Sequence, residues 1–313
     1  MGEIVGATLC AHVPRLMMSD EEKKAYMGSK VSTLDKALEQ MREDQIKDLA
    51  FDTFLIFDTH WPTTTNFYID SREWHGGFYT SDEVPEMIHD YEFLYLGDPE
   101  LAQLIVEEAD QGPLKGRVRK TEGGKLGLMT RHYPTLVTMR YLNPDPGPKK
   151  LVLPMSIAYT SSIQNELDYG EAIARAVKRS NRRVVLVATG GLSHKFHSFD
   201  TIPSRTSPDA ANIYDLEHLA ADVEVLWLLE HGMHEELLRK AETFREKSSP
   251  EGNFAHYLRM VGVLGGYDCE IKAIQYGEYE SAIGTGQVVL WFPVQRTDNK
   301  TIEDKEVHDA TNS

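Results

Sequence analysis

The chain has 313 residues, and its 41% hydrophobic and 26% charged fractions are typical of a globular protein rather than a disordered one. Its formal net charge of −16 argues against a general nucleic-acid binder and against binding to an anionic membrane surface. No apolar run approaches the ~18 residues of a membrane span, so no membrane association is expected. Cys10 and Cys269 are the only cysteines, which excludes a disulfide framework and a thiolate zinc cage. With no secretory signal at the start, we expect a cytoplasmic protein.

The first half of the chain contains two apolar runs that predict buried strands, at 3–10 and 51–58. A polar segment over 20–48 carries apolar residues at helical spacing and predicts a helix. Asp98, followed by Pro99, predicts the start of another helix, because Asp caps helix N-termini and Pro suits the first turn.

The second half adds two predicted strands, at 150–157 and 183–189, on either side of an amphipathic segment over 170–179. This β-α-β pattern predicts an α/β fold, a single domain with a central mixed sheet flanked by helices. Further helices are expected at 215–231, 233–246 and 252–264, then a loop over 280–286 and a strand over 286–293. The domain is expected to span 1–295, and the polar residues 296–313 to form a flexible tail.

His12 and His60 share a context, because each directly follows a predicted apolar strand and precedes a proline by two residues. In α/β sheets, functional groups gather at the carboxyl ends of strands. Two imidazoles at that edge could converge on one metal ion. The alternative is that each histidine only caps its strand through a backbone hydrogen bond.

His194 lies in a glycine-containing exit from the predicted strand over 183–189, Gly190-Gly191-Leu192-Ser193-His194. Glycines allow close approach of the backbone to a ligand, and an imidazole there is well placed as an acid or base. The segment is similar to the nucleophile elbow of serine hydrolases, but Lys195 stands where that motif has glycine. A serine hydrolase is therefore disfavoured.

A metal that activates dioxygen commonly has two histidine ligands and one carboxylate, with open positions for substrate and gas. Glu251 stands at a Pro-bounded turn that opens a predicted helix, and Glu246 is its nearest rival. Periodicity alone does not choose between them. His231 and His234 also have ligand spacing, but Gly232 interrupts the helix between them, which favours a structural role.

Taken together, these segments resemble the class III extradiol ring-cleavage dioxygenases, the superfamily of protocatechuate 4,5-dioxygenase beta chains. The sequence of these segments is most similar to that of the homoprotocatechuate (3,4-dihydroxyphenylacetate) 2,3-dioxygenase branch. The matching pieces occur in order along nearly the whole chain: Ala11-His12-Val13-Pro14, Phe57-Asp58-Thr59-His60-Trp61, Leu192-Ser193-His194, Glu251-Gly252-Asn253 and Gly284-Thr285-Gly286-Gln287.

The resemblance implies a non-haem Fe(II) enzyme that adds O2 to a catecholic ring and opens it beside the two hydroxyls. It makes His12, His60 and Glu251 the iron ligands and His194 the acid/base histidine. It also implies a homo-oligomer, a dimer or tetramer.

Substrate-binding roles fall on His132 and Tyr133, in a segment that departs from the acid-aromatic-glycine pattern of the family, with His132 in the acidic place and Pro134 in the glycine place. This departure leaves the ring substrate open. The expected substrate is 3,4-dihydroxyphenylacetate or a similar substituted catechol, with protocatechuate, a gallate derivative, catechol, a biaryl catechol and 2-aminophenol as alternatives.

A substrate carboxylate needs a cationic partner, and Arg15, Arg131 and Lys195 lie near the motifs. The sequence does not select among them. Two other readings use the same fold: a companion subunit without catalytic activity, and a zinc hydrolase.

Overall fold

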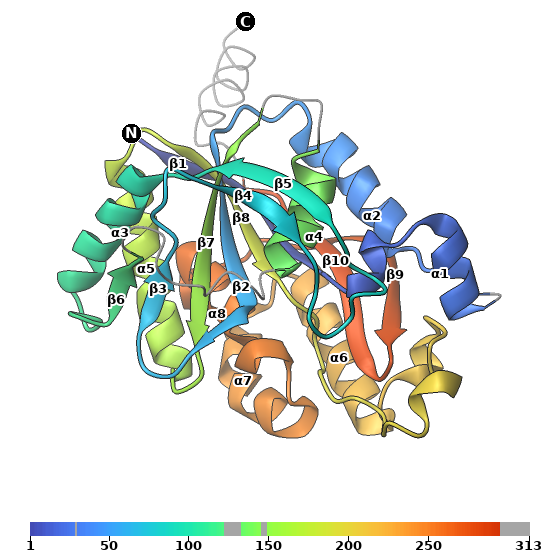
Figure 1. Ribbon diagram of the computed structural model, residues 1–313. Coiled ribbons are helices and arrows are strands. Elements are labelled where there is room, and N and C mark those ends of the chain that lie inside the picture. Colours follow the sequence, from blue (N-terminus) through green and yellow to red (C-terminus); the bar gives the residue numbers. More distant parts are fainter. Residues whose placement is uncertain (29, 122–132, 145–148, 295–313) are drawn as a thin grey trace, which may run out of the picture.

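Four parallel strands form the centre of the sheet because their side chains are apolar on both faces, as a strand covered by helices on two sides requires. They are β7 (Leu151–Ala158), β2 (Thr53–Thr63), β8 (Arg183–Thr189) and β1 (Glu3–Cys10), in that spatial order (Figure 1). The computed structural model describes residues 1–28, 30–121, 133–144 and 149–294.

Antiparallel pairing makes the sheet mixed, since β10 pairs with β1, β9 with β10, and β3 with β7 in the order β6-β3-β7-β2-β8-β1-β10-β9. The hairpin of β4 and β5 stands apart as a second small sheet. These strands are β3 (Phe67–Ile69), β4 (Trp74–Tyr79), β5 (Tyr91–Leu96), β6 (Val118–Lys120), β9 (Ile274–Ala282) and β10 (Thr285–Phe292).

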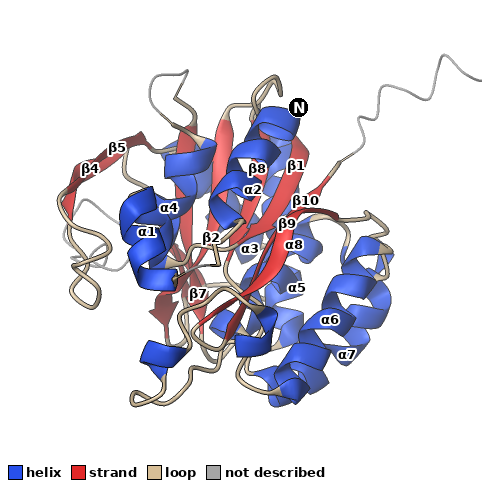
Figure 2. Ribbon diagram, turned by 90° about the vertical axis from the view of Figure 1, so that its right-hand side faces the viewer, coloured by secondary structure: helices blue, strands red, loops and turns tan. Residues whose placement is uncertain are grey.

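Helices cover both faces of the large sheet, with α1 and α4 on one side and α6 and α7 on the other in Figure 2. One apolar core joins α3, α5, α6, α7 and α8 to alternate strand residues such as Leu55 and Leu186, and the other joins α2 and α4 to their neighbours, such as Phe54 and Val185. The described α-helices are α1 (Asp20–Met27), α2 (Leu34–Met41), α3 (Pro99–Asp110), α4 (Tyr133–Leu142), α5 (Ile163–Arg179), α6 (Leu216–Glu230), α7 (His234–Ser248) and α8 (Ala255–Val263).

The predicted α/β class and single-domain organisation are confirmed, as is the Asp98 cap, whose side chain accepts a hydrogen bond from the Leu101 N–H. The single helix expected over 20–48 is wrong. It is divided into α1 and α2, because the chain leaves α1 at Gly28, which has a φ of 75°. The loop expected over 280–286 is also wrong, since β9 and β10 form an antiparallel hairpin there.

The tail predicted over 296–313 lies outside the described residues. Across the described ranges, no helix is both long and apolar enough to cross a membrane.

Candidate metal centre

His12 leaves the carboxyl end of β1 beside β8, where the Gly190 N–H donates to the Cys10 carbonyl. Its Nδ1 lies 2.9 Å from Oγ1 of Thr189, the last residue of β8. An Nδ1–H that donates to this hydroxyl leaves the Nε2 lone pair for a ligand, an arrangement common among metal-binding histidines. The imidazole is buried, and this packing together with the Thr189 contact fixes its orientation.

His60 lies where β2 and β7 lose register, between the pairs Phe57–Met155 and Pro62–Ile157. Such irregularities re-aim side chains and are frequent next to active sites. Asp58 stabilises the backbone at this irregularity, because its carboxylate accepts the His60 backbone N–H at 2.9 Å. The Thr135 hydroxyl of α4 donates to the same carboxylate at 2.7 Å.

Glu251 comes from a turn with unusual backbone geometry. Gly252, Asn253 and Phe254 have φ values of 55°, 59° and 61°, in the left-handed region that bulky side chains rarely adopt. Backbone strain of this kind tends to persist at functional sites. The turn is tied to the chain before His194, because the Glu251 N–H donates to the Leu192 carbonyl at 3.0 Å. α8 therefore begins at Ala255, three residues later than the helix predicted from 252.

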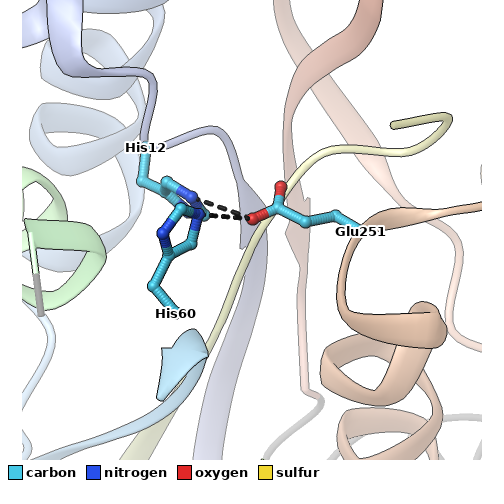
Figure 3. A group of neighbouring side chains, drawn as sticks. All are labelled: His12, His60 and Glu251. Carbon is cyan, nitrogen blue, oxygen red and sulfur yellow. Dashed lines mark ion pairs between the residues drawn. The ribbon is translucent and has the colours of Figure 1, made fainter. Parts of the chain in front are cut away.

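The three predicted ligands converge on one point (Figure 3). Nε2 of His12 and Nε2 of His60 lie 3.0 and 3.2 Å from the same oxygen, Oε1 of Glu251. The two imidazole rings are nearly perpendicular, with centroids 4.9 Å apart. One ligand atom from each side chain lies within 4.8 Å of the others, a spacing that could hold a metal ion.

The electrostatics of the cluster favour an ionised carboxylate. Burial alone would raise the pKa of Glu251, but the adjacent imidazoles hold it well below its usual value. For His60, burial opposes the charged form, but the hydrogen bond and charge of Glu251 outweigh it and raise the pKa. Glu251 also accepts the Thr59 hydroxyl at 2.7 Å and the Gly191 N–H at 2.6 Å.

His194 and Tyr133 flank the three ligands. Nε2 of His194 lies 3.7 Å from Oε2 of Glu251, and the Tyr133 hydroxyl lies 3.3 Å from Nε2 of His60. Burial lowers the pKa of His194 and raises that of Tyr133, which favours the uncharged form of both. His132 and Arg131 lie outside the described residues.

A cavity of about 310 Å³ opens in front of these five side chains, all of which line it. Its wall is largely apolar and includes Phe196 and Ile283. This combination of an apolar wall and a few convergent polar groups is typical of a small-molecule site. The size accommodates a substituted aromatic ring.

The other candidates lie elsewhere. Glu246 is exposed on α7, and His231 ends α6 with Nδ1 2.7 Å from the Trp227 carbonyl oxygen. His234 is buried between the Tyr257 hydroxyl and the Ile271 carbonyl, at 2.9 and 2.7 Å. These contacts give both histidines the structural role expected from the break at Gly232.

Comparison with known proteins agrees with this geometry. Residues 6–290 match the family described as the catalytic LigB subunit of aromatic ring-opening dioxygenase. The chain belongs to this LigB family. It is therefore an extradiol-type aromatic ring-cleavage dioxygenase, as the sequence motifs predicted.

Two curated relatives cover most of the chain. A 3,4-dihydroxyphenylacetate 2,3-dioxygenase of Escherichia coli is 28% identical over 269 residues, 85% of this chain and 91% of the relative. A 2-aminophenol 1,6-dioxygenase beta subunit of a Pseudomonas species is 24% identical over 312 residues, which cover 92% of this chain and 93% of the relative. The crystal structure of an uncharacterized Escherichia coli K12 protein shares the fold, with a TM-score of 0.56 at 16% identity, covering 92% of this chain and 99% of that one.

Sequence reasoning missed the hydroxyl and amide groups that contact the candidate ligands. Thr59 and Gly191 bind the Glu251 carboxylate, and Thr189 binds His12. In the sequence, Gly191 indicates only a flexible position, and the two threonines lie among strand residues with no distinguishing pattern. The one available signal is their place beside His60 and Gly190, directly at the strand exits.

Proposed function

We propose that the protein is a non-haem Fe(II)-dependent extradiol dioxygenase that cleaves 3,4-dihydroxyphenylacetate or a similarly substituted catechol. The observation that carries this proposal is the position of two imidazole nitrogens, 3.0 and 3.2 Å from one Glu251 oxygen, at the wall of a cavity of ring size. Two histidines and one carboxylate with open positions suit non-haem Fe(II). His12, His60 and Glu251 are the proposed ligands.

The donor set itself supports a cation at this point. Glu251 is buried, and its partners among the described residues are imidazoles, a hydroxyl and a backbone amide, with no Arg or Lys among them. A buried carboxylate is rarely left without a compensating charge. An iron(II) ion held by these three side chains would supply Lewis acidity toward the catechol oxygens and one-electron chemistry toward dioxygen.

The flanking residues have separate proposed roles. His194, with Nε2 at the cavity wall, accepts a proton from a substrate hydroxyl and returns one to the ring-opened product. Tyr133, uncharged because burial raises its pKa, donates a hydrogen bond that orients the substrate oxygens. Both atoms of O2 enter the product as the ring carbon–carbon bond beside the diol breaks, so no external reductant is consumed.

The test is anaerobic reconstitution with Fe(II) or Zn(II), followed by oxygen uptake on a panel of rings. The panel contains 3,4-dihydroxyphenylacetate, protocatechuate, gallate, catechol and 2-aminophenol. We expect oxygen consumption and a yellow ring-opened product with iron only. Absence of uptake on every ring would contradict the proposal and leave the zinc hydrolase or the non-catalytic subunit. A second candidate substrate is 2-aminophenol, because of the beta-subunit relative.

The proposed division of labour predicts different losses at two histidines. His60→Ala should lose iron, because affinity depends on the number of ligands. His194→Ala should retain iron and turn over ~10²–10⁴-fold more slowly, the usual cost of losing a positioned acid or base. Metal analysis and steady-state kinetics measure both, with His231→Ala, at the C-terminal cap of α6, as a matched control. Equal iron loss in the two site variants would refute the roles.

We further propose that the enzyme works in the cytoplasm as a homodimer or homotetramer. The relative named as a beta subunit supports assembly into oligomers. Light scattering during size-exclusion chromatography measures the mass directly, and a monomer would contradict this assembly.

A further inference from the structure

Arg15 lines the same cavity as the three proposed ligands. It follows His12 by three residues, which limits their Cα separation to roughly 10 Å. A ring whose oxygens face the His12 imidazole can therefore present a substituent to Arg15. The side chain is only 4% exposed, so solvent screens its charge weakly.

The hydrogen bonds of Arg15 leave part of its guanidinium free. Nη1 donates to the Ser281 carbonyl and Nη2 to Oε2 of Glu280, both at 3.2 Å. The buried Nε has no hydrogen-bond partner among the described residues. Nε is closed off from solvent, so the donors left for a ligand are the second N–H groups of Nη1 and Nη2, which these two hydrogen bonds do not use.

Glu280 does not depend on Arg15 alone for its partners. Its carboxylate also accepts the hydroxyls of Ser32 and Thr33, at 2.7 and 2.8 Å, and the backbone N–H of Thr33. This buried acid is therefore stabilised largely from the start of α2. Glu280 holds the guanidinium in place while Arg15 keeps an N–H available for a second acceptor.

Arg15 forms an ion pair with Glu280, and the cavity that it lines also contains the carboxylates of Glu251 and Glu83. Among the described residues that line it, Arg15 is the one Arg or Lys. Lys195 instead places Nζ 4.2 Å from the centre of the Tyr214 ring. Glu83 also lines the cavity, but it is exposed, so water and salt screen its repulsion of an anion more strongly.

We propose that Arg15 binds a carboxylate substituent of the aromatic substrate while the diol of the same ring faces His12, His60 and Glu251. This inference rests on the proposed function and selects within it, because it favours rings with an anionic side chain over neutral catechols. An arginine–carboxylate hydrogen bond is charge-assisted and strong, and a neutral substituent satisfies the same N–H less well.

The direct test compares 3,4-dihydroxyphenylacetate with 3,4-dihydroxyphenylacetamide, which keeps the shape and removes the charge. We expect the iron-loaded enzyme to favour the acid by about 10- to 100-fold in kcat/KM, mainly through KM. Arg15→Gln should bring the acid-to-amide ratio close to one, and Arg15→Lys, which keeps the charge, should restore part of it. Arg175→Gln, which removes an Arg–Glu pair outside the cavity, should keep the wild-type ratio.

A second measurement does not depend on the variant folding or on iron. Calorimetry of the metal-free wild-type protein should show tighter binding of phenylacetate than of phenylacetamide. Equal affinities, equal kcat/KM values for acid and amide, or an unchanged ratio in Arg15→Gln would each overturn the role of Arg15. These outcomes leave ring cleavage intact, whereas absence of cleavage of every diol would refute the proposed function instead.

Discussion

Arg259 and Glu251 enter the protein interior from the same stretch of chain, the 3-10 turn Glu251–Phe254 and the helix α8 that follows it. Arg259 is fully buried with Glu166 of α5, and its Nε and Nη2 lie 2.9 and 2.8 Å from one Glu166 oxygen. Nη1 donates to the Ser156 carbonyl, and Ser161 donates to the other Glu166 oxygen. Here a guanidinium and a carboxylate pair directly with each other.

Glu251 has partners of a different kind. Its neighbours are imidazoles, and the cluster borders a cavity. The comparison shows how one stretch of chain places two buried charges for two purposes. A carboxylate paired with arginine holds elements together, whereas a carboxylate that faces imidazoles beside a cavity is able to bind a metal cation.

The largest effect we expect comes from breaking the closed pair. Arg259→Met leaves the buried Glu166 carboxylate with the Ser161 hydroxyl as its described partner, which should lower the free energy of unfolding by about 3–5 kcal/mol. Urea denaturation measures this loss. The double variant Arg259→Met, Glu166→Leu should recover most of it, because no uncompensated charge remains. A loss below about 1 kcal/mol in the single variant would show that this pair is not what joins α5 to α8.

A third buried carboxylate, Asp222, extends the comparison because its partners are the Ser193 N–H and hydroxyl and the Tyr279 hydroxyl. Burial raises its pKa from 3.8 to about 6. The folded state therefore binds this proton more tightly than the unfolded state. Its stabilising contribution is complete below pH 3.8 and is lost as the pH rises through about 6.

Asp222→Asn should remove that pH dependence. A shift of this size corresponds to roughly 3 kcal/mol, so wild type should lose about this much stability relative to the variant between pH 4 and pH 7. Urea denaturation across this range measures the difference. Parallel curves for the two proteins would contradict the assignment.

Metal binding at Glu251 should stabilise the folded protein, whereas the Arg259–Glu166 pair should not respond to metal. Anaerobic Fe(II) at 100 times its Kd should raise the stability of wild type by about 2.7 kcal/mol. Glu251→Gln should show no such gain, whereas Glu246→Gln, a matched control at the exposed rival position, should show all of it. A full gain in Glu251→Gln would remove this residue from the ligand set.

The smallest effect is expected at an exposed ion pair whose N–O distances are as short as those of the buried Arg259–Glu166 pair. Nζ of Lys240 lies 2.7 Å from both Glu224 and Glu236 on the helix surface. Exposed pairs are screened by water and contribute little. Lys240→Ala should leave the urea midpoint unchanged within error, and a clear decrease would show that distance rather than burial governs these pairs.

The central strands could be predicted because β1, β2, β7 and β8 are short apolar runs, and such runs have few alternatives in a soluble domain. The sequence does not predict β9, because exposed residues such as Gly277 and Glu278 interrupt it and no apolar run is left. α4 was missed for the opposite reason. It is buried from Pro134 to Met139, so it has no polar face to reveal a helical period.

The site followed a similar division. Strand ends identified His12 and His60, because the exit of a buried strand is readable from composition. The direction of Glu251 was not readable, since it depends on the left-handed residues Gly252, Asn253 and Phe254. A helix was expected from residue 252, and local propensity gives no sign that a bulky residue such as Phe254 adopts a positive φ.

The order of strands in the sheet has a consequence for biosynthesis. β1 lies between β8 and β10 in the sheet. Its two neighbours exist only after residues 183–189 and 285–292 have been synthesised. Pairings this distant along the chain slow folding. Glu251 also comes 191 residues after His60 along the chain. The proposed site of His12, His60 and Glu251 therefore assembles late, after synthesis of the segments that separate these residues, and does not guide the early steps of folding.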